Sequence, residues 1–331
     1  MVALVARVAT PKPSWNLAHD VNQLFSYAFM RHAFVAGTIV AVLAGVVGYF
    51  VVLRQSSFAA HALSEIGFAG ASGGVVYGFG AVTGLLVMSL LGAALIGLLG
   101  KRLRGRDAVI GTVLAFSLGL GSYFLTRYKG NASGAFGLLF GEILGISVHD
   151  IWVIAIAGAL TLVVTAAVFR PLLFASLDED VAEARGVPVR ALSVLFFLVV
   201  AVAVTAAVQI VGVLLIFSLL VTPGAIADRV CRTPGRAVAL CVGLSVVFVW
   251  AGLTVTYYSD FPVGFLITAF AFGCYLLVRL VSARPRQRWT PRSRTAEPAT
   301  GEPAEPAAAG PGGRAMTPLG SVGVDPYQGQ P

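Results

Sequence analysis

The sequence contains little charge and little cysteine. Of its 331 residues, 57% are hydrophobic and 11% are charged, and the mean hydropathy is +0.87. So few charged groups cannot cover a water-facing surface, which excludes soluble enzymes and nucleic-acid-binding proteins. The cysteines Cys231, Cys241 and Cys274 lie far apart and form no C-x-x-C pair, so neither a disulfide scaffold nor a zinc knuckle is indicated. The composition indicates an integral membrane protein.

Motifs for nucleotide hydrolysis and for metal-dependent proteolysis are also missing. The sequence has no G-x-x-x-x-G-K-[ST] stretch, because Gly100 and Lys101 lack the leading glycine and the following Ser or Thr. It has no H-E-x-x-H. We therefore expect no enzyme activity, no catalytic residue and no bound cofactor in this chain.

Long apolar segments dominate what is present. About 20 apolar residues are enough for a helix to cross roughly 30 Å of hydrocarbon. Eight clear candidates lie at 33–53, 81–99, 108–126, 150–169, 191–208, 210–227, 237–256 and 263–281, and a ninth, less apolar and rich in glycine, at 58–80. The sequence predicts an all-α integral membrane protein, a polytopic bundle of eight or nine transmembrane helices.

The two ends of the chain differ from this apolar domain, which we place at 33–281. Apolar and polar residues at helical spacing in 17–30 predict an interfacial amphipathic helix within an N-terminal segment, 1–32. Residues 282–331 have too little apolar surface to offset the entropy of ordering, so we expect a disordered tail.

Basic residues gather in three loops between the apolar segments, and these loops indicate the orientation of the chain. Loops rich in Lys and Arg face the cytoplasm and its anionic lipid, so the net charge of +8 indicates membrane lipid rather than nucleic acid as a partner. The loops are at 101–106, 170–190 and 229–236. Alternation then predicts a multi-pass protein of the cell membrane with a cytoplasmic C-terminal tail. Nine spans place the N-terminus outside, whereas a re-entrant 58–80 segment places it inside.

Small residues recur at every fourth position in two of the predicted spans. Gly37, Ala41 and Gly45 share one face of the first span, and Gly70, Gly74 and Gly78 share one face of the 58–80 segment. Faces without large side chains allow helix backbones to approach closely. The 58–80 segment is therefore predicted to lie inside the bundle.

Two ionisable residues of this same segment, His61 and Glu65, are candidate metal ligands. An ionisable group costs a few kcal/mol at bilayer depth, on the order of 2–4, and is kept mainly where it lines a path or meets a partner. Four residues apart, these side chains share one helix face and offer an imidazole nitrogen and a carboxylate oxygen. The alternative is a hydrogen-bonded pair at a helix start.

A further candidate ligand is Glu142. It lies in a short apolar segment near 135–147, which is too short to span the membrane and is predicted to be a re-entrant or short helix. Asp150 follows it and is predicted to cap the next span.

The loop at 176–190 is charged and helix-like from Leu177 to Arg185. Gly186 and Pro188 are typical of a helix end. A solvated loop is the alternative interpretation of this pattern.

Four segments, in order along the chain, resemble the permease subunits of ABC-type zinc, manganese and iron uptake systems. VVLRQSSFAAHALSEIGFAGASGG resembles that family's arginine-containing turn and metal-binding helix. LLFGEILGIS resembles its Phe-Gly-acid segment, SLDEDVAEARGVPVR its coupling loop, and QIVGVLLIFSLLVTPGAIADR its long apolar helix with a late proline. The resemblance covers about residues 28–281 and leaves the tail unmatched.

The resemblance implies roles for particular residues and partners. The family commonly has Asp at the position of His61 and His at that of Glu65, so this chain carries the pair in swapped order. One imidazole with one carboxylate suits zinc, manganese and iron(II) alike. The resemblance also implies a homodimer around one path, an extracytoplasmic metal-binding lipoprotein, and an ABC ATPase subunit. The ATPase would bind the loop through Asp178, Glu179, Asp180, Glu183, Arg185, Gly186 and Pro188.

These observations together predict a permease subunit that imports a divalent transition metal ion, with ATP hydrolysis on a separate chain. A secondary cation carrier or a proton-coupled metal carrier, with Glu65 as the proton site, is the alternative. A membrane scaffold without transport leaves the polar residues of the 58–80 segment unexplained.

Overall fold

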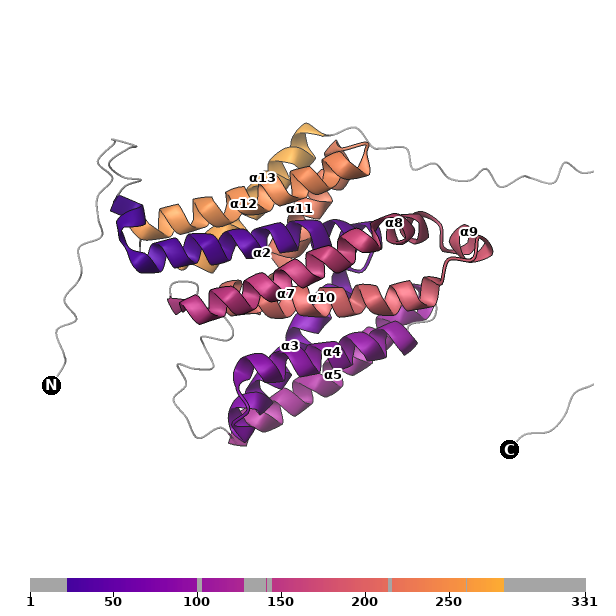
Figure 1. The fold of residues 1–331 in the computed structure, drawn as a ribbon, viewed down its shortest axis with the longest axis horizontal. Helices are drawn as coiled ribbons and strands as arrows, with labels where there is room; N and C mark the ends of the chain where they lie inside the picture. The colour runs from indigo at the N-terminus through magenta and orange to yellow at the C-terminus, as the bar shows by residue number, and fades with distance from the viewer. Residues whose placement is uncertain are drawn as a thin grey trace, which may run out of the picture. The chain divides into compact units, whose positions relative to one another are not determined.

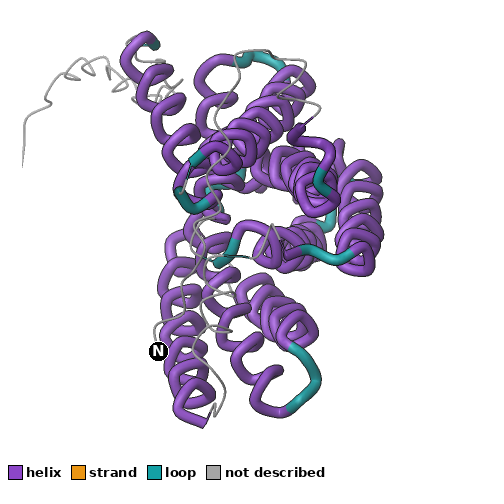
Figure 2. The backbone as a smooth tube through the Cα atoms, turned by 90° about the vertical axis from the view of Figure 1, so that its left-hand side faces the viewer, coloured by secondary structure: helices purple, strands orange, loops and turns teal. Residues whose placement is uncertain are grey.

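A computed structural model describes residues 23–99, 103–127, 141, 145–213, 216–259 and 261–282, all within one compact unit. The described residues contain helices and no strand, joined by loops (Figures 1 and 2). The helices are α2 (Ala28–Leu53), α3 (Ser57–Tyr77), α4 (Ala81–Leu99), α5 (Leu103–Arg127), α7 (Val148–Ala167), α8 (Phe169–Leu177), α9 (Glu179–Ala184), α10 (Val189–Val211), α11 (Ile216–Val230), α12 (Pro234–Tyr258) and α13 (Val263–Val281). The predicted all-α fold is confirmed.

Seven of these helices are long and apolar enough to cross a membrane: α2, α4, α5, α7, α10, α12 and α13. Two more helices lie in the same bundle. α3 has 21 residues but is less apolar, and α11 has 15 residues, which at about 1.5 Å per residue is shorter than the hydrocarbon layer. The predicted count of eight or nine transmembrane helices therefore agrees with seven clear spans and these two additional helices.

α2 lies at the centre of the bundle because its apolar residues are buried around most of its circumference. It contacts α7, α10, α11 and α12, whereas α3 pairs with α4 and α5 (Figure 1). α10 contacts α2, α3 and α4 and so connects the two groups. Fully buried side chains such as Leu43, Phe50, Leu63 and Ile66 form one continuous hydrophobic core.

Glycines allow the close helix contacts that the small-residue pattern predicts. A Cβ at Gly45 would lie 2.7 Å from the Val242 Cα of α12. Cβ atoms at Gly70 and Gly74 would collide with the carbonyl oxygens of Gly84 and Gly80, so α3 and α4 touch through their backbones. Both predicted faces, in α2 and in α3, are therefore used for packing.

Gly78 departs from this prediction. It is the C-cap of α3, with a φ of +81°, and a Cβ there would meet nothing within 4 Å. A glycine ends the helix here because it adopts the left-handed conformation without steric cost. The sequence pattern of every fourth residue continues past the last helical turn, which is why it included Gly78.

Several helix boundaries differ from the predicted spans. α2 begins at Ala28, five residues before the predicted start of the span, and the helical turn at 23–26 precedes it. Asp150 contributes to the cap of α7, but Ser147 is the N-cap residue. The Ser147 hydroxyl accepts from the Asp150 N–H, and the Asp150 carboxylate accepts from the Ser147 N–H, which forms a capping box.

Candidate functional site

α3 holds His61 and Glu65 one helical turn apart on the same face, as the spacing predicts. Both side chains are half-buried, whereas Ala62, Leu63 and Ser64 between them are buried. The face that carries the pair is therefore the most accessible part of this turn of α3.

The imidazole of His61 has a buried nitrogen with no partner. Its Nδ1 makes no hydrogen bond to any residue that the structure describes. The Glu65 carboxylate therefore does not accept a hydrogen bond from this Nδ1. A buried polar atom without a partner costs about 1–3 kcal/mol, so this nitrogen would gain from a further contact.

Phe217 of α11 packs against the imidazole of His61. Its ring contacts the imidazole edge-to-face, with 5.3 Å between the ring centroids. Ser64 does not contribute a free hydroxyl, because its Oγ donates to the His61 carbonyl at 2.7 Å. The sequence analysis did not single out Phe217, because the contact joins residues far apart in the chain and no local pattern indicates it.

His61 and Glu65 are not joined by a third candidate metal ligand among the described residues. The described ranges contain no group of three or more His, Cys, Asp or Glu residues that could hold a metal ion. Glu142 lies outside the described residues, as does most of the predicted short segment near 135–147. If His61 and Glu65 bind a transition metal, these two groups alone leave its coordination incomplete.

The sequence around Gly70 also matches a hydrolase pattern, G-x-S-x-G, at 70–74. In an active nucleophile motif the serine sits on a sharp turn between a strand and a helix. Ser72 instead lies within α3, is buried, and donates to the Phe68 carbonyl at 3.0 Å. The structure of this segment does not support a hydrolase.

The predicted charged loop at 176–190 contains the last two residues of α8 (Phe169–Leu177) and the whole of α9 (Glu179–Ala184). The expected helix from Leu177 to Arg185 is interrupted at Asp178, whose carboxylate caps α9 by accepting from the Val181 N–H at 3.0 Å. An N-cap residue has non-helical backbone angles, so Asp178 cannot continue α8 while it caps α9. The helix therefore breaks at this residue. Gly186 has a φ of +81° and follows α9, as predicted for a helix end.

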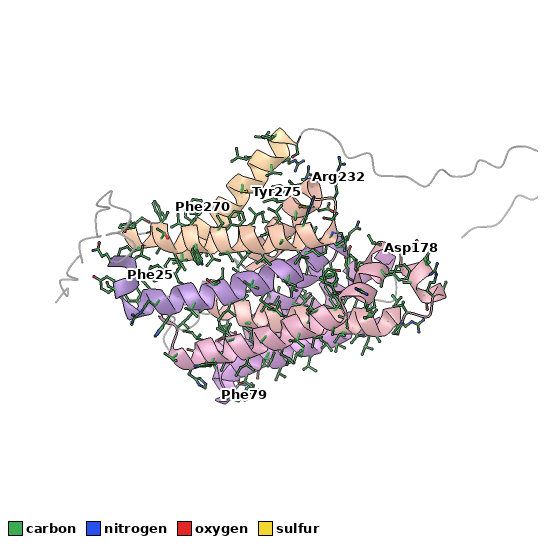
Figure 3. All side chains as sticks on the ribbon, turned by 45° about the horizontal axis from the view of Figure 1, so that its top comes forward. Phe25, Phe79, Asp178, Arg232, Phe270 and Tyr275 are labelled. Atoms are coloured by element: carbon green, nitrogen blue, oxygen red, sulfur yellow. The ribbon has the colours of Figure 1, made fainter. Side chains whose placement is uncertain are left out.

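α9 projects from one end of the bundle and presents its charges to solvent. Figure 3 shows Asp178 and Arg232 at one end and Phe25 at the opposite end, so two of the basic loops lie on the same side. Glu179, Asp180, Glu183 and Arg185 are exposed, whereas Ala182 is buried against Ala175 and Leu192. This apolar contact attaches α9 to α8 and α10.

Arg54 is the arginine of the turn that the resemblance named, but the sequence analysis predicted no contact for it. It is the C-cap of α2, its side chain is 3% exposed, and it forms an ion pair with Glu179 of α9, 3.6 Å between Nη2 and Oε1. The signal was present in the sequence, because Arg54 is a charged residue between two apolar segments. Its partner, 125 positions later, has no sequence signature.

Comparison with known proteins identifies the group to which this fold belongs. The model of the ABC 3 transport family matches residues 26–282, which include every helix from α2 to α13. The chain belongs to the ABC 3 transport family. The resemblance predicted from the four sequence segments is confirmed.

Two relatives whose names refer to manganese match over most of their length. The chain is 28% identical over 270 residues to the manganese transport system membrane protein MntC of Halalkalibacterium halodurans, with 81% of this chain and 92% of the relative covered. It is also 28% identical over 269 residues to the manganese import system permease protein ScaB of Streptococcus parasanguinis, covering 81% and 95%.

Solved structures agree with this membership. PsaBC from Streptococcus pneumoniae, solved in complex with Fab, has a chain that is 27% identical, with a TM-score of 0.72 and coverage of 82% of this chain and 98% of that chain. A metal-chelate type ABC transporter in an inward-facing conformation, 16% identical with a TM-score of 0.64, shares the fold. The ABC 3 transport fold thus accounts for the whole described bundle.

Proposed function

We propose that this chain is the membrane permease of an ABC importer for a divalent transition metal ion, and that manganese is its favoured cargo. One observation carries the proposal: on a buried helix of a transport-family fold, His61 offers a buried, unpaired nitrogen one turn from the Glu65 carboxylate. The relatives named for manganese transport favour that metal. An imidazole with a carboxylate is compatible with manganese, zinc and iron(II).

A homodimer completes the site in this proposal. Two copies of α3 facing one path bring together two imidazoles and two carboxylates, which is a full set for a transition metal. The absence of a three-ligand group within one described chain supports a shared site. Transport requires that the ion be released again, so in this proposal the two pairs hold it only weakly.

In this proposal, ATP hydrolysis on a separate chain supplies the energy for transport. The ABC ATPase subunit docks on α9, because this short, capped and exposed helix is attached to the bundle by an apolar contact at Ala182. ATP-driven movement of the α9 region alternates the path between the two sides of the membrane. A metal-binding lipoprotein delivers the ion on the side opposite α9.

The side assignment follows from the basic loops. Arg232 and Asp178 lie at the same end of the bundle, and the positive-inside rule places that end in the cytoplasm. The tail follows α13, and in this proposal it is cytoplasmic in a multi-pass protein of the cell membrane, as the basic loops favour. The ion pair between Arg54 and Glu179 brings the end of α2 to the same side, so α3 crosses toward the outside.

The energy source is tested by uptake into vesicles. The permease is reconstituted with its ATPase, and uptake of radioactive manganese is measured with the lipoprotein outside and ATP inside, then with a proton gradient alone. We expect uptake only with ATP. Uptake driven by the proton gradient without the ATPase would instead support the carrier in which Glu65 binds the proton.

A further inference from the structure

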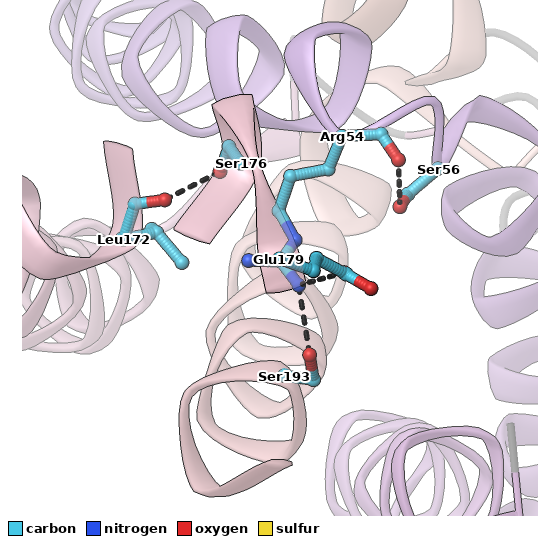
Figure 4. Close-up of polar contacts among 6 residues, drawn as sticks. All are labelled: Arg54, Ser56, Leu172, Ser176, Glu179 and Ser193. Atoms are coloured by element: carbon cyan, nitrogen blue, oxygen red, sulfur yellow. Dashed lines mark hydrogen bonds and ion pairs between the residues drawn. The ribbon is translucent and has the colours of Figure 1, made fainter. Parts of the chain in front are cut away.

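Arg54 occupies the turn between α2 and α3, where a buried charge has to find several partners. Its side chain is 3% exposed, although Arg is rarely buried unless it is paired. The metal pair does not explain why a guanidinium is buried at this turn. Its contacts reach three other parts of the fold (Figure 4).

The side chain of Arg54 contacts both α9 and α10. Its Nη2 donates to the Ser193 Oγ of α10 at 2.7 Å and lies 3.6 Å from the Glu179 Oε1 of α9. The guanidinium carbon lies 5.1 Å from the centre of the Phe196 ring, also on α10. The planar, many-donor guanidinium allows these contacts to form at once.

The backbone of Arg54 is hydrogen-bonded to the residue that caps the start of α3. Its carbonyl accepts a hydrogen bond from the Ser56 Oγ at 3.1 Å, and Ser56 is the N-cap residue of α3. Gln55 between them has a φ of +51°, which is uncommon for a residue with a side chain and leaves the turn little freedom. His61 lies about one turn into α3, so a displacement of Arg54 displaces the first turn of the helix that carries the metal pair.

Glu179 links α9 to the turn between α2 and α3. It is the first residue of α9, and its side chain is 46% exposed, so it lies at the boundary between the bundle and the surface offered to a partner. α9 is otherwise attached through Ala182 to the apolar cluster with α8 and α10. The ion pair adds a connection from α9 to the α2–α3 turn.

We propose that Arg54 is a positioning residue that couples α9 to the metal-binding helix α3 through its ion pair with Glu179. This inference rests on the proposed function, in which the ATPase moves the α9 region. Movement of α9 shifts the Glu179 carboxylate, the guanidinium follows its partner, and the α2–α3 turn transmits the shift to the start of α3. Loss of the pair separates ATP hydrolysis from ion movement.

The coupling ratio tests this role. In vesicles containing the complete complex with its lipoprotein, manganese ions transported and ATP molecules hydrolysed are counted for the parent chain, Arg54→Gln, Arg54→Lys, Glu179→Gln and the double variant Arg54→Gln/Glu179→Gln. Arg170→Gln is the matched control, because Arg170 is exposed on α8 and its loss removes the same charge near α9. A purely structural role lowers the amount of assembled complex but leaves the ratio per complex unchanged.

We expect Arg54→Gln and Glu179→Gln each to lower the ions transported per ATP by about threefold or more, the scale of coupling energies carried by single contacts. The double variant is expected to be no worse than the more affected single variant, because both changes remove the same interaction. Arg54→Lys keeps the charge but not the fork of donors, so its ratio should lie between. Arg170→Gln should match the parent.

Each possible result of this experiment either supports or overturns the proposed role of Arg54. Parent-like ratios in both single variants, or losses that multiply in the double variant, would overturn the proposal while leaving the importer intact. If Arg54→Gln does not assemble, Arg54→Lys and Glu179→Gln decide by the same ratio. A parent complex without ATP-driven uptake would overturn the proposed function itself, and the inference with it.

Discussion

Helices α3 and α4 lie side by side but meet different surroundings. α4 has a mean hydropathy of 2.3 in its most apolar window, yet only 6 of its 19 residues are buried. α3 is less apolar, and 13 of its 21 residues are buried. Leu91, Leu95 and Leu98 of α4 are exposed on the outside of the bundle, where the membrane would cover them.

The difference shows that a helix need not be strongly apolar to lie inside the bundle, whereas α2 and α10 are both strongly apolar and mostly buried. A helix enclosed by other helices can carry glycine, serine and even an ionisable pair, because protein groups and a transported ion replace lipid around it. A lipid-facing helix needs apolar side chains on its outer face. α3 is therefore the helix to alter if the buried, polar character of the path is to be tested.

The largest effect is expected where α3 and α4 touch. Gly70→Leu places a side chain against the Gly84 backbone and Met88, so the two helices have to separate. Overpacking of this kind costs about 1–3 kcal/mol or more when backbone has to move. We expect strong loss of folded protein, measured as monodisperse material in detergent and as thermal stability.

The matched control for Gly70→Leu is Gly119→Leu on α5. A Cβ at Gly119 meets nothing within 4 Å, so this substitution should leave yield and thermal stability near those of the parent. Equal losses in the two variants would contradict the distinction between enclosed and lipid-facing helices.

A smaller effect is expected at α9, which is enclosed neither by protein nor by lipid. Inserting Gly-Ser after Ala182 breaks the short helix and its apolar attachment, whereas Glu179→Gln removes one half-exposed charge, a change of at most about 1 kcal/mol in docking. The insertion should therefore lower transport-linked ATP hydrolysis more than Glu179→Gln does. ATPase activity of the reconstituted complex measures this, and an insertion variant with parental activity would mean that α9 is not the docking element.

The smallest effect is expected from the tail. Residues 284–331 are rich in Pro, Ala and Gly and were predicted from composition to contribute no packed core. Deleting them should leave membrane insertion and uptake rate unchanged. A truncated chain that transports at a small fraction of the parental rate would show that the tail has a role beyond the bundle.

Much of the fold and part of the site could be predicted from sequence. Apolar segments of about 20 residues gave most spans, and the four-residue spacing of His61 and Glu65 placed them on one face of α3, because both signals are local. The predicted span at 210–227 was displaced from α11, since the apolar run continues through Gly212, where φ is +84° and α10 ends. Hydropathy does not detect such a turn.

Contacts between distant residues could not be predicted. The ion pair of Arg54 with Glu179 and the ring contact of Phe217 with His61 depend on how α9, α10 and α11 pack against α2 and α3. The break at Asp178 was missed for a local reason: the aspartate was counted as part of a charged helix, although it caps α9. Whether an aspartate continues one helix or caps the next depends on the surrounding structure.

The central claim is that the polar pair on the enclosed helix α3 is the metal path. His61→Ala and Glu65→Ala are compared with Ser64→Ala, a matched control on the same turn whose hydroxyl bonds only to the His61 carbonyl among the described residues. Uptake of radioactive manganese into vesicles is measured for complexes that elute like the parent. The account predicts that uptake is abolished in both ligand variants and retained in Ser64→Ala. Parental uptake in His61→Ala and Glu65→Ala would contradict it.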